Sequence, residues 1–130
     1  MPSPKRCPCG TGESYPACCG RFHTGAASAP TARALMRSRF SAFAVADPGY
    51  LLRTWHSSTR PQRLSLDEQV TWTRLEIVDV AGGGLFDTDG VVEFRAHYRF
   101  GTAREVLHER STFGREDGQW RYLDGTQRRA

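Results

Sequence analysis

The chain has 130 residues, of which 38% are hydrophobic and 25% charged, and its formal net charge at pH 7 is +4. This length fits one compact domain with a small appendage. No stretch approaches the roughly 20 apolar residues that span a bilayer, which excludes a membrane-spanning helix. Met1–Arg6 is polar with no apolar core after it, so we expect no secretory signal and no membrane partner. The cationic charge comes almost entirely from arginines dispersed along the chain, which is more typical of a solvated surface than of a nucleic-acid interface.

All the cysteines of the chain lie near its start, as Cys7, Cys9, Cys18 and Cys19. A disulfide between Cys7 and Cys9, or between Cys18 and Cys19, would have strained geometry. Disulfides between the two pairs would close one short loop only. In the reducing, cytoplasmic compartment expected here, such a cluster is more typical of a metal site. Zinc binds four thiolates tetrahedrally at roughly 2.3 Å. The spacing therefore predicts a Zn²⁺ site, with disulfides or redox chemistry as the alternative.

Residues around the cysteines favour the same interpretation. Gly10 and Gly12 allow a tight turn between the ligands, and basic neighbours such as Arg6 favour thiolate over thiol. His23 could replace one cysteine as a ligand, but beside four cysteines we expect it to be a neighbour of the site. A closed four-sulfur shell leaves no position for water or substrate, so the predicted site is structural.

Small residues and a proline at 25–30 predict a boundary after the cysteine segment. The range 31–46 reads as a helix, because apolar residues recur there at helical spacing. Asp47 is a candidate cap for a second helix with Pro48 at its first position, running to about His56.

After residue 69 the pattern changes to strands, which we expect at 70–80, 91–100, 105–113 and 120–123. The alternation slips near Thr73, which suggests a bulge. The clearest strand presents one apolar face, made by Val92, Phe94, Ala96, Tyr98 and Phe100. Asp117-Gly118 is a hairpin signal between the last two strands. The predicted fold class is α+β, with helices packed on one face of an antiparallel sheet.

Two resemblances add to this reading. Residues 7–20, CPCGTGESYPACCG, resemble the SEC-C zinc-binding motif. Together with the segments 34–43, 54–60 and 107–111, the chain resembles the YchJ-like family of uncharacterised bacterial proteins. The resemblance implies a SEC-C module at 1–28 and an NTF2-like domain at 29–130, in which a curved sheet forms a cone around helices.

The resemblance also implies the ligand set Cys7, Cys9, Cys18 and Cys19, and a module that docks a protein partner. Some relatives carry a second SEC-C element at the C-terminus, whereas this sequence ends at Arg128–Ala130 without one. NTF2-like sheets often pair, so a homodimer is a further expectation.

The open end of such a cone hosts ligands in many NTF2-like proteins, so inward polar residues are candidates for a pocket. Glu109 and Ser111 share a strand face with Leu107 and Phe113, and a buried carboxylate needs a cation or a raised pKa. An acid–base role would fall to Glu109 or His108. We favour a structural Arg–Glu pair and assign no catalytic residue. The full candidate set for the pocket is Arg37, Arg39, Trp55, His56, Arg60, Tyr98, Glu109 and Ser111.

Three functions are compatible with these features. The sequence favours a zinc-stabilised binding or adaptor protein over an enzyme. The first alternative is a small-molecule-binding or isomerase/cyclase-like protein that uses the cavity. The second is nucleic-acid binding through the arginines and the zinc knuckle.

Overall fold

The computed structural model describes residues 5–127. Three helices precede four strands, which form one antiparallel sheet in the order β1-β2-β3-β4. The expectations placed on Met1–Pro4 and on Arg128–Ala130 lie outside the described residues. In chain order the elements are α1 (Gly20–His23), α2 (Ala32–Ala44), α3 (Pro48–Arg53), β1 (Val70–Gly82), β2 (Asp89–Phe100), β3 (Ala103–Glu116) and β4 (Gln119–Gln127).

Side-chain caps begin both longer helices. Thr31 accepts a hydrogen bond from the Ala34 amide at the start of α2, and Asp47 accepts one from the Tyr50 amide at the start of α3. The second helix ends at Arg53 rather than near His56 as predicted. The reason is tertiary, because the His56 amide donates to the carbonyl of Tyr122 in β4 instead of continuing the helix.

The strands follow the predicted pattern with three differences. The register of β1 shifts between Trp72 and Arg74, where the sequence predicted a bulge, and again between Ile77 and Asp79. The face of β2 is buried at Val92, Phe94 and Ala96, but Phe100 at its end is 46% exposed. The last strand is longer than predicted, because β4 pairs with β3 as far as Gln127.

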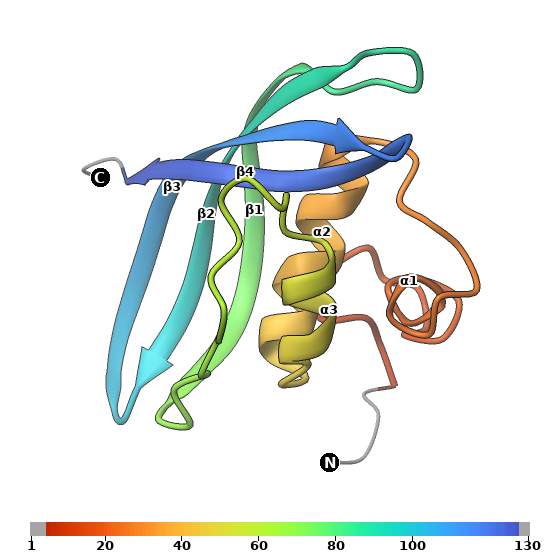
Figure 1. Cartoon of the computed structure of the whole chain (residues 1–130). Helices are drawn as coiled ribbons and strands as arrows, with labels where there is room; N and C mark the ends of the chain where they lie inside the picture. Colours follow the sequence, from red (N-terminus) through yellow and green to blue (C-terminus); the bar gives the residue numbers. More distant parts are fainter. Residues whose placement is uncertain (1–4, 128–130) are drawn as a thin grey trace.

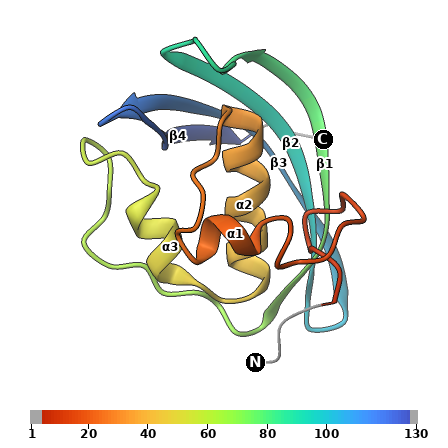
Figure 2. The same cartoon turned by 90° about the vertical axis from the view of Figure 1, so that its right-hand side faces the viewer.

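The sheet curves around α2, which lies in its hollow (Figures 1 and 2). Leu35 and Phe40 of α2 pack against Phe94, Phe113 and Trp120 of the sheet in the main core. None of the helices in residues 5–127 is long and apolar enough to cross a membrane.

A second core cluster lies on the other side of α2. It joins Phe22 of α1 to Ala42 of α2 and to Tyr50 and Leu51 of α3. Apolar packing therefore crosses the boundary expected between residues 28 and 29, and that boundary stays a prediction. α1 lies on the far side of α2 from the strands β1–β3 (Figure 1).

Candidate metal centre and pocket

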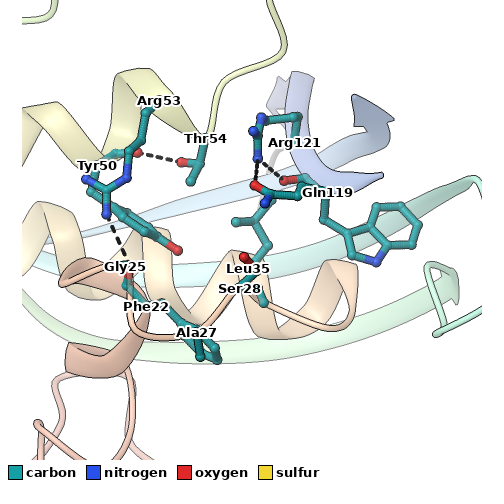
Figure 3. A pocket seen from close by; sticks show the side chains of 12 residues that line it. Phe22, Gly25, Ala27, Ser28, Leu35, Tyr50, Arg53, Thr54, Gln119 and Arg121 are labelled. Atoms are coloured by element: carbon teal, nitrogen blue, oxygen red, sulfur yellow. Dashed lines mark hydrogen bonds between the residues drawn. The ribbon is translucent and has the colours of Figure 1, made fainter. Parts of the chain in front are cut away.

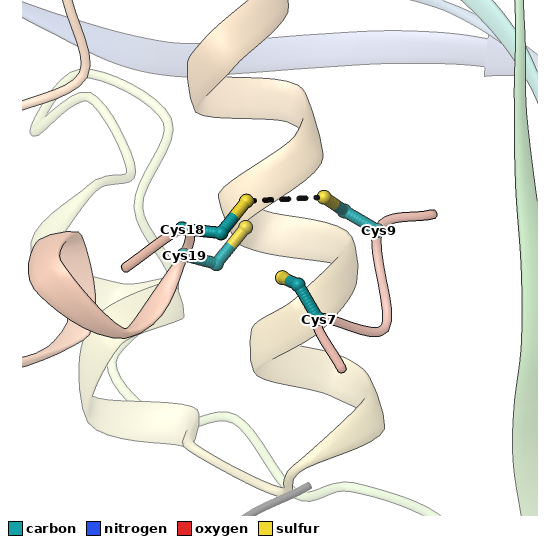
Figure 4. Close-up of side chains that lie close together, drawn as sticks. All are labelled: Cys7, Cys9, Cys18 and Cys19. Atoms are coloured by element: carbon teal, nitrogen blue, oxygen red, sulfur yellow. Dashed lines mark hydrogen bonds between the residues drawn. The ribbon is translucent and has the colours of Figure 1, made fainter. Parts of the chain in front are cut away.

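The cysteine sulfurs form one compact cluster. The four Sγ atoms lie within 4.8 Å of one another, and those of Cys9 and Cys18 are 3.6 Å apart (Figure 4). Four thiolates at roughly 2.3 Å from a tetrahedral ion would place their sulfurs about 3.8 Å from each other. All four residues are buried and none is in a disulfide. The set therefore fits a four-coordinate metal ion, with one donor from each residue.

Tight local turns bring the four cysteines together. The Cys7 amide donates to the Glu13 carbonyl, which closes the loop between the ligand pairs. At the second pair, the Gly20 amide donates to the Tyr15 carbonyl at 2.8 Å. A Cβ at Gly20 would lie 2.7 Å from that same carbonyl oxygen, so only glycine fits this approach. The knuckle is thus built from local backbone contacts.

The ionisation of the cluster favours a cation at its centre. Hydrogen bonds from Cys19 and Cys9 hold the pKa of the Cys7 thiol well below its usual value. The hydrogen bond to Cys7 raises the pKa of Cys19, and burial raises the pKa of Cys18. Negative charge on one sulfur therefore opposes the ionisation of its neighbours. A divalent cation would remove this opposition, since metal coordination deprotonates thiols.

Two hydroxyl groups support the sulfurs from outside. Thr11 Oγ1 lies 3.2 Å from Cys18 Sγ, within the module. Ser41 Oγ, on the buried face of α2, lies 3.4 Å from Cys7 Sγ. Sequence reasoning missed Ser41, because its contact crosses 34 positions and no local pattern signals it. Such outer contacts orient metal ligands and tune their basicity.

The structure places His23 beside the cluster, as a neighbour. Its Nε2 donates to the carbonyl of Ser38 in α2 at 2.8 Å, so its Nδ1 is the acceptor for the Tyr15 hydroxyl. Both ring nitrogens are occupied, and within the described part of the chain the clustered donor set contains only the four cysteines. His23 thus links the knuckle to α2.

Three of the candidate pocket residues come together under the sheet. Arg39, Glu109 and Ser111 line a cavity of about 90 Å³ between α2 and the strands, together with Trp72 and Tyr122. Ser111 Oγ donates to Glu109 Oε2 at 2.7 Å. The cavity is small compared with ligand pockets, which measure roughly 300–1,000 Å³.

The expected Arg–Glu pair does not form by direct contact. Arg39 donates through Nη1 to the Leu51 carbonyl at 2.7 Å and to Thr54 Oγ1 at 2.8 Å. Its guanidinium also lies 4.5 Å from the ring centre of Tyr122. Burial lowers the pKa of Arg39 to about 10. Within residues 5–127 no ion pair joins it to Glu109, because carbonyl, hydroxyl and aromatic groups surround it instead.

The other candidate side chains are bound elsewhere. Arg37 donates to the Cys9 carbonyl at 2.9 Å and so contacts the cysteine cluster and not the cavity. His56 contacts Ser58, and Arg60 donates to the Trp55 carbonyl in the segment after α3.

The aromatic candidates border the cavity without lining it. Trp55 packs edge-on against Tyr122, and Tyr98 packs against Trp72. His108 lies on the opposite face of the sheet, where its Nε2 is 2.8 Å from Glu93 Oε2. It does not share the cavity with Glu109, because neighbouring strand residues point to opposite faces.

A buried cluster of four cysteines next to a curved sheet that wraps around a helix defines a class. Its members are small cone-shaped α+β proteins with a cysteine-rich knuckle. The family model described as "YchJ, middle NTF2-like domain" matches residues 31–125. The chain belongs to the corresponding UPF0225 family. It is 61% identical over 125 residues to a UPF0225 protein of Streptomyces coelicolor, covering 96% of this chain and 97% of that relative. It is 54% identical to one of Corynebacterium glutamicum, covering 93% and 96%.

Solved structures agree with this assignment. A SEC-C motif containing protein from Rhodopseudomonas palustris superposes with a TM-score of 0.82 at 31% identity, covering 95% of this chain and 98% of that one. Another from Psychrobacter arcticus gives 0.76 at 28% identity, covering 98% and 85%. The resemblance to YchJ-like proteins and the NTF2-like α+β fold are confirmed.

Proposed function

We propose that the chain is a zinc-stabilised binding protein whose SEC-C module docks a protein partner. The carrying observation is the closed, buried shell of four sulfurs, which suits a structural ion and leaves no position for a substrate. Zinc is the ion that such an all-cysteine tetrahedral set prefers. A site that needs reduced thiols also suits the cytoplasm.

The surface of the module supports a docking role. The loop between the two cysteine pairs, residues 10–14, is exposed, and the hydrogen bond from the Cys7 amide to the Glu13 carbonyl holds its base. Lys5 and Arg21 are also exposed and basic on the same module. Basic residues on this module suit an acidic protein surface, because opposite charges attract. A loop that is already held at its base also loses less conformational entropy on binding.

Affinity capture with charge-reversed variants tests the docking role. The full chain serves as bait beside a Lys5→Glu/Arg21→Glu double variant and a control, Arg104→Glu, at the exposed β2–β3 hairpin. We expect one partner that survives nuclease treatment, binds the control and is lost from the double variant. Retention by the double variant would contradict docking through this surface. Loss after nuclease treatment would favour the nucleic-acid alternative.

The cavity under the sheet supports a second candidate function. Glu109, Ser111 and Arg39 place polar groups in an otherwise apolar space, as in a small-molecule site. Its volume of about 90 Å³ limits the occupant to a few heavy atoms. A crystal structure with a small molecule bound against Glu109 would favour this candidate over the binding protein.

A further inference from the structure

A second pocket lies where the cysteine module meets the rest of the chain. It has a volume of about 240 Å³, larger than the cavity under the sheet. Its walls come from α1 and the segment after it, from α2 and α3, and from the start of β4 (Figure 3). No sequence pattern indicated it, because its lining residues are spread from 22 to 121.

The lining of this pocket divides by chemistry. One part is apolar, and Phe22, Ala27, Leu35 and Trp120 contribute to it. The other part is polar and cationic, with Arg53 of α3 and Arg121 of β4 as its two charged residues. Among residues 5–127, no aspartate or glutamate lines the pocket. A small ligand with an apolar body and one negative group matches this division.

The acidic groups near the two arginines suggest that the ligand carries a single negative charge. Arg121 shares Glu116, whose Oε1 lies 3.9 Å from its Nε, with Arg60. Arg53 takes part in no ion pair among residues 5–127. Its Nη2 donates to the carbonyls of Phe22 and His23 at 3.2 and 2.7 Å, which holds the side chain in place. One guanidinium is thus positioned and without an acidic partner.

We propose that this pocket binds an amphipathic monocarboxylate, with the carboxylate on Arg53 and the apolar part against Phe22 and Trp120. A guanidinium presents several N–H groups in one plane, which is the geometry that carboxylates accept. The carboxylate can come from a free organic acid or from the C-terminus of a polypeptide with an apolar last residue. This inference goes beyond the docking role and does not depend on it.

The test is an NMR titration of the full chain as purified, following the amides of Phe22, Ala27 and Trp120. The probes are N-acetyl-leucinate, hexanoate and inorganic phosphate. N-acetyl-leucinamide, which has the same apolar part but no charge, is the control. We expect saturable shifts with a carboxylate and none with the amide. Binding of N-acetyl-leucinate alone would identify a polypeptide terminus, and equal or tighter binding of hexanoate would identify a free acid. Equal shifts with the amide, or tighter binding of phosphate, would overturn the proposal.

Variants decide whether the shifts come from this pocket. Arg53→Gln should weaken carboxylate binding at least about tenfold, since it removes a charge-assisted hydrogen bond. Arg104→Gln, a distant exposed control, should bind as the wild type does. Ser28→Trp fills the pocket from its exposed rim without altering either guanidinium, and it should abolish binding even if Arg53→Gln fails to fold. Wild-type affinity in Ser28→Trp would overturn the assignment.

Discussion

Ser41 Oγ lies 3.4 Å from Cys7 Sγ, so a helix of the NTF2-like domain contacts a sulfur of the candidate metal centre. Arg37 and Ser38 of the same helix contact the Cys9 carbonyl and the His23 ring. The knuckle and the helix are therefore coupled through several polar contacts. A substitution in one should alter the stability of the other.

Metal removal should destabilise the chain well beyond the knuckle. We expect a chelator, or Cys9→Ser, to release about one zinc per chain and to lower the free energy of unfolding by about 4 kcal/mol or more, as loss of a structural metal does. Because Phe22 packs with Tyr50 and Leu51, protection of α3 amides should fall too. Metal analysis, thermal unfolding and hydrogen exchange measure these effects. Unchanged exchange in α3 would mean that the module unfolds independently.

Ser41→Ala tests the contact between helix and sulfur. Loss of one hydroxyl hydrogen bond to a thiolate should cost about 1 kcal/mol and speed the transfer of zinc to a colorimetric chelator, with the zinc content unchanged. Ser14→Ala, at an exposed position of the same module, is the matched control. Equal transfer rates in both variants would show that Ser41 does not tune the site.

Glu109→Gln should lower the pKa of Tyr122. Burial, followed by the charge of Glu109, raises this pKa to about 12 from 10. The raised value stabilises the fold below pH 10, and that stability is lost as pH rises toward 12. Ultraviolet titration of the phenol, with Tyr122→Phe subtracted, measures the change. Asp124→Asn should lower the pKa of Tyr122 by less, because Asp124 contributes less to the shift. A larger effect of Asp124→Asn would contradict the position of Glu109 beside Tyr122.

Gly125→Ala should disturb the position of Glu109. A Cβ at residue 125 would clash with the Glu109 carboxylate and push it from Ser111, to which it is hydrogen-bonded at 2.7 Å. We expect a loss of about 1 kcal/mol in stability, typical of mild overpacking. In a Glu109→Ala background the same substitution should cost much less. A double-mutant cycle by chemical denaturation measures the difference, and additive effects would rule out this contact.

The candidate metal centre was accessible to sequence reasoning because it is local. All four cysteines lie within one short segment, so their spacing already constrains the geometry that a metal could use. The same holds for the caps at Thr31 and Asp47, whose bonds reach only three residues ahead. Alternation likewise predicted the buried face of β2, because strand side chains point to alternate sides.

The pocket residues show where this reasoning stops. The strand pattern placed Glu109 on the buried face and so favoured an Arg–Glu pair. In the fold, Arg39 instead donates to the Leu51 carbonyl and packs on aromatic rings. Likewise, His108 and Glu109 are neighbours in sequence but lie on opposite faces of the sheet.

The sequence by itself determined the family, the α+β class and the cluster of four cysteines, since each depends on short-range spacing or on a matched motif. Only the tertiary structure decided that Ser41 contacts Cys7, and that Arg53 and Arg121 line one pocket. These relationships join residues tens of positions apart. Packing of α2 into the curved sheet sets their distances, and no local pattern records them.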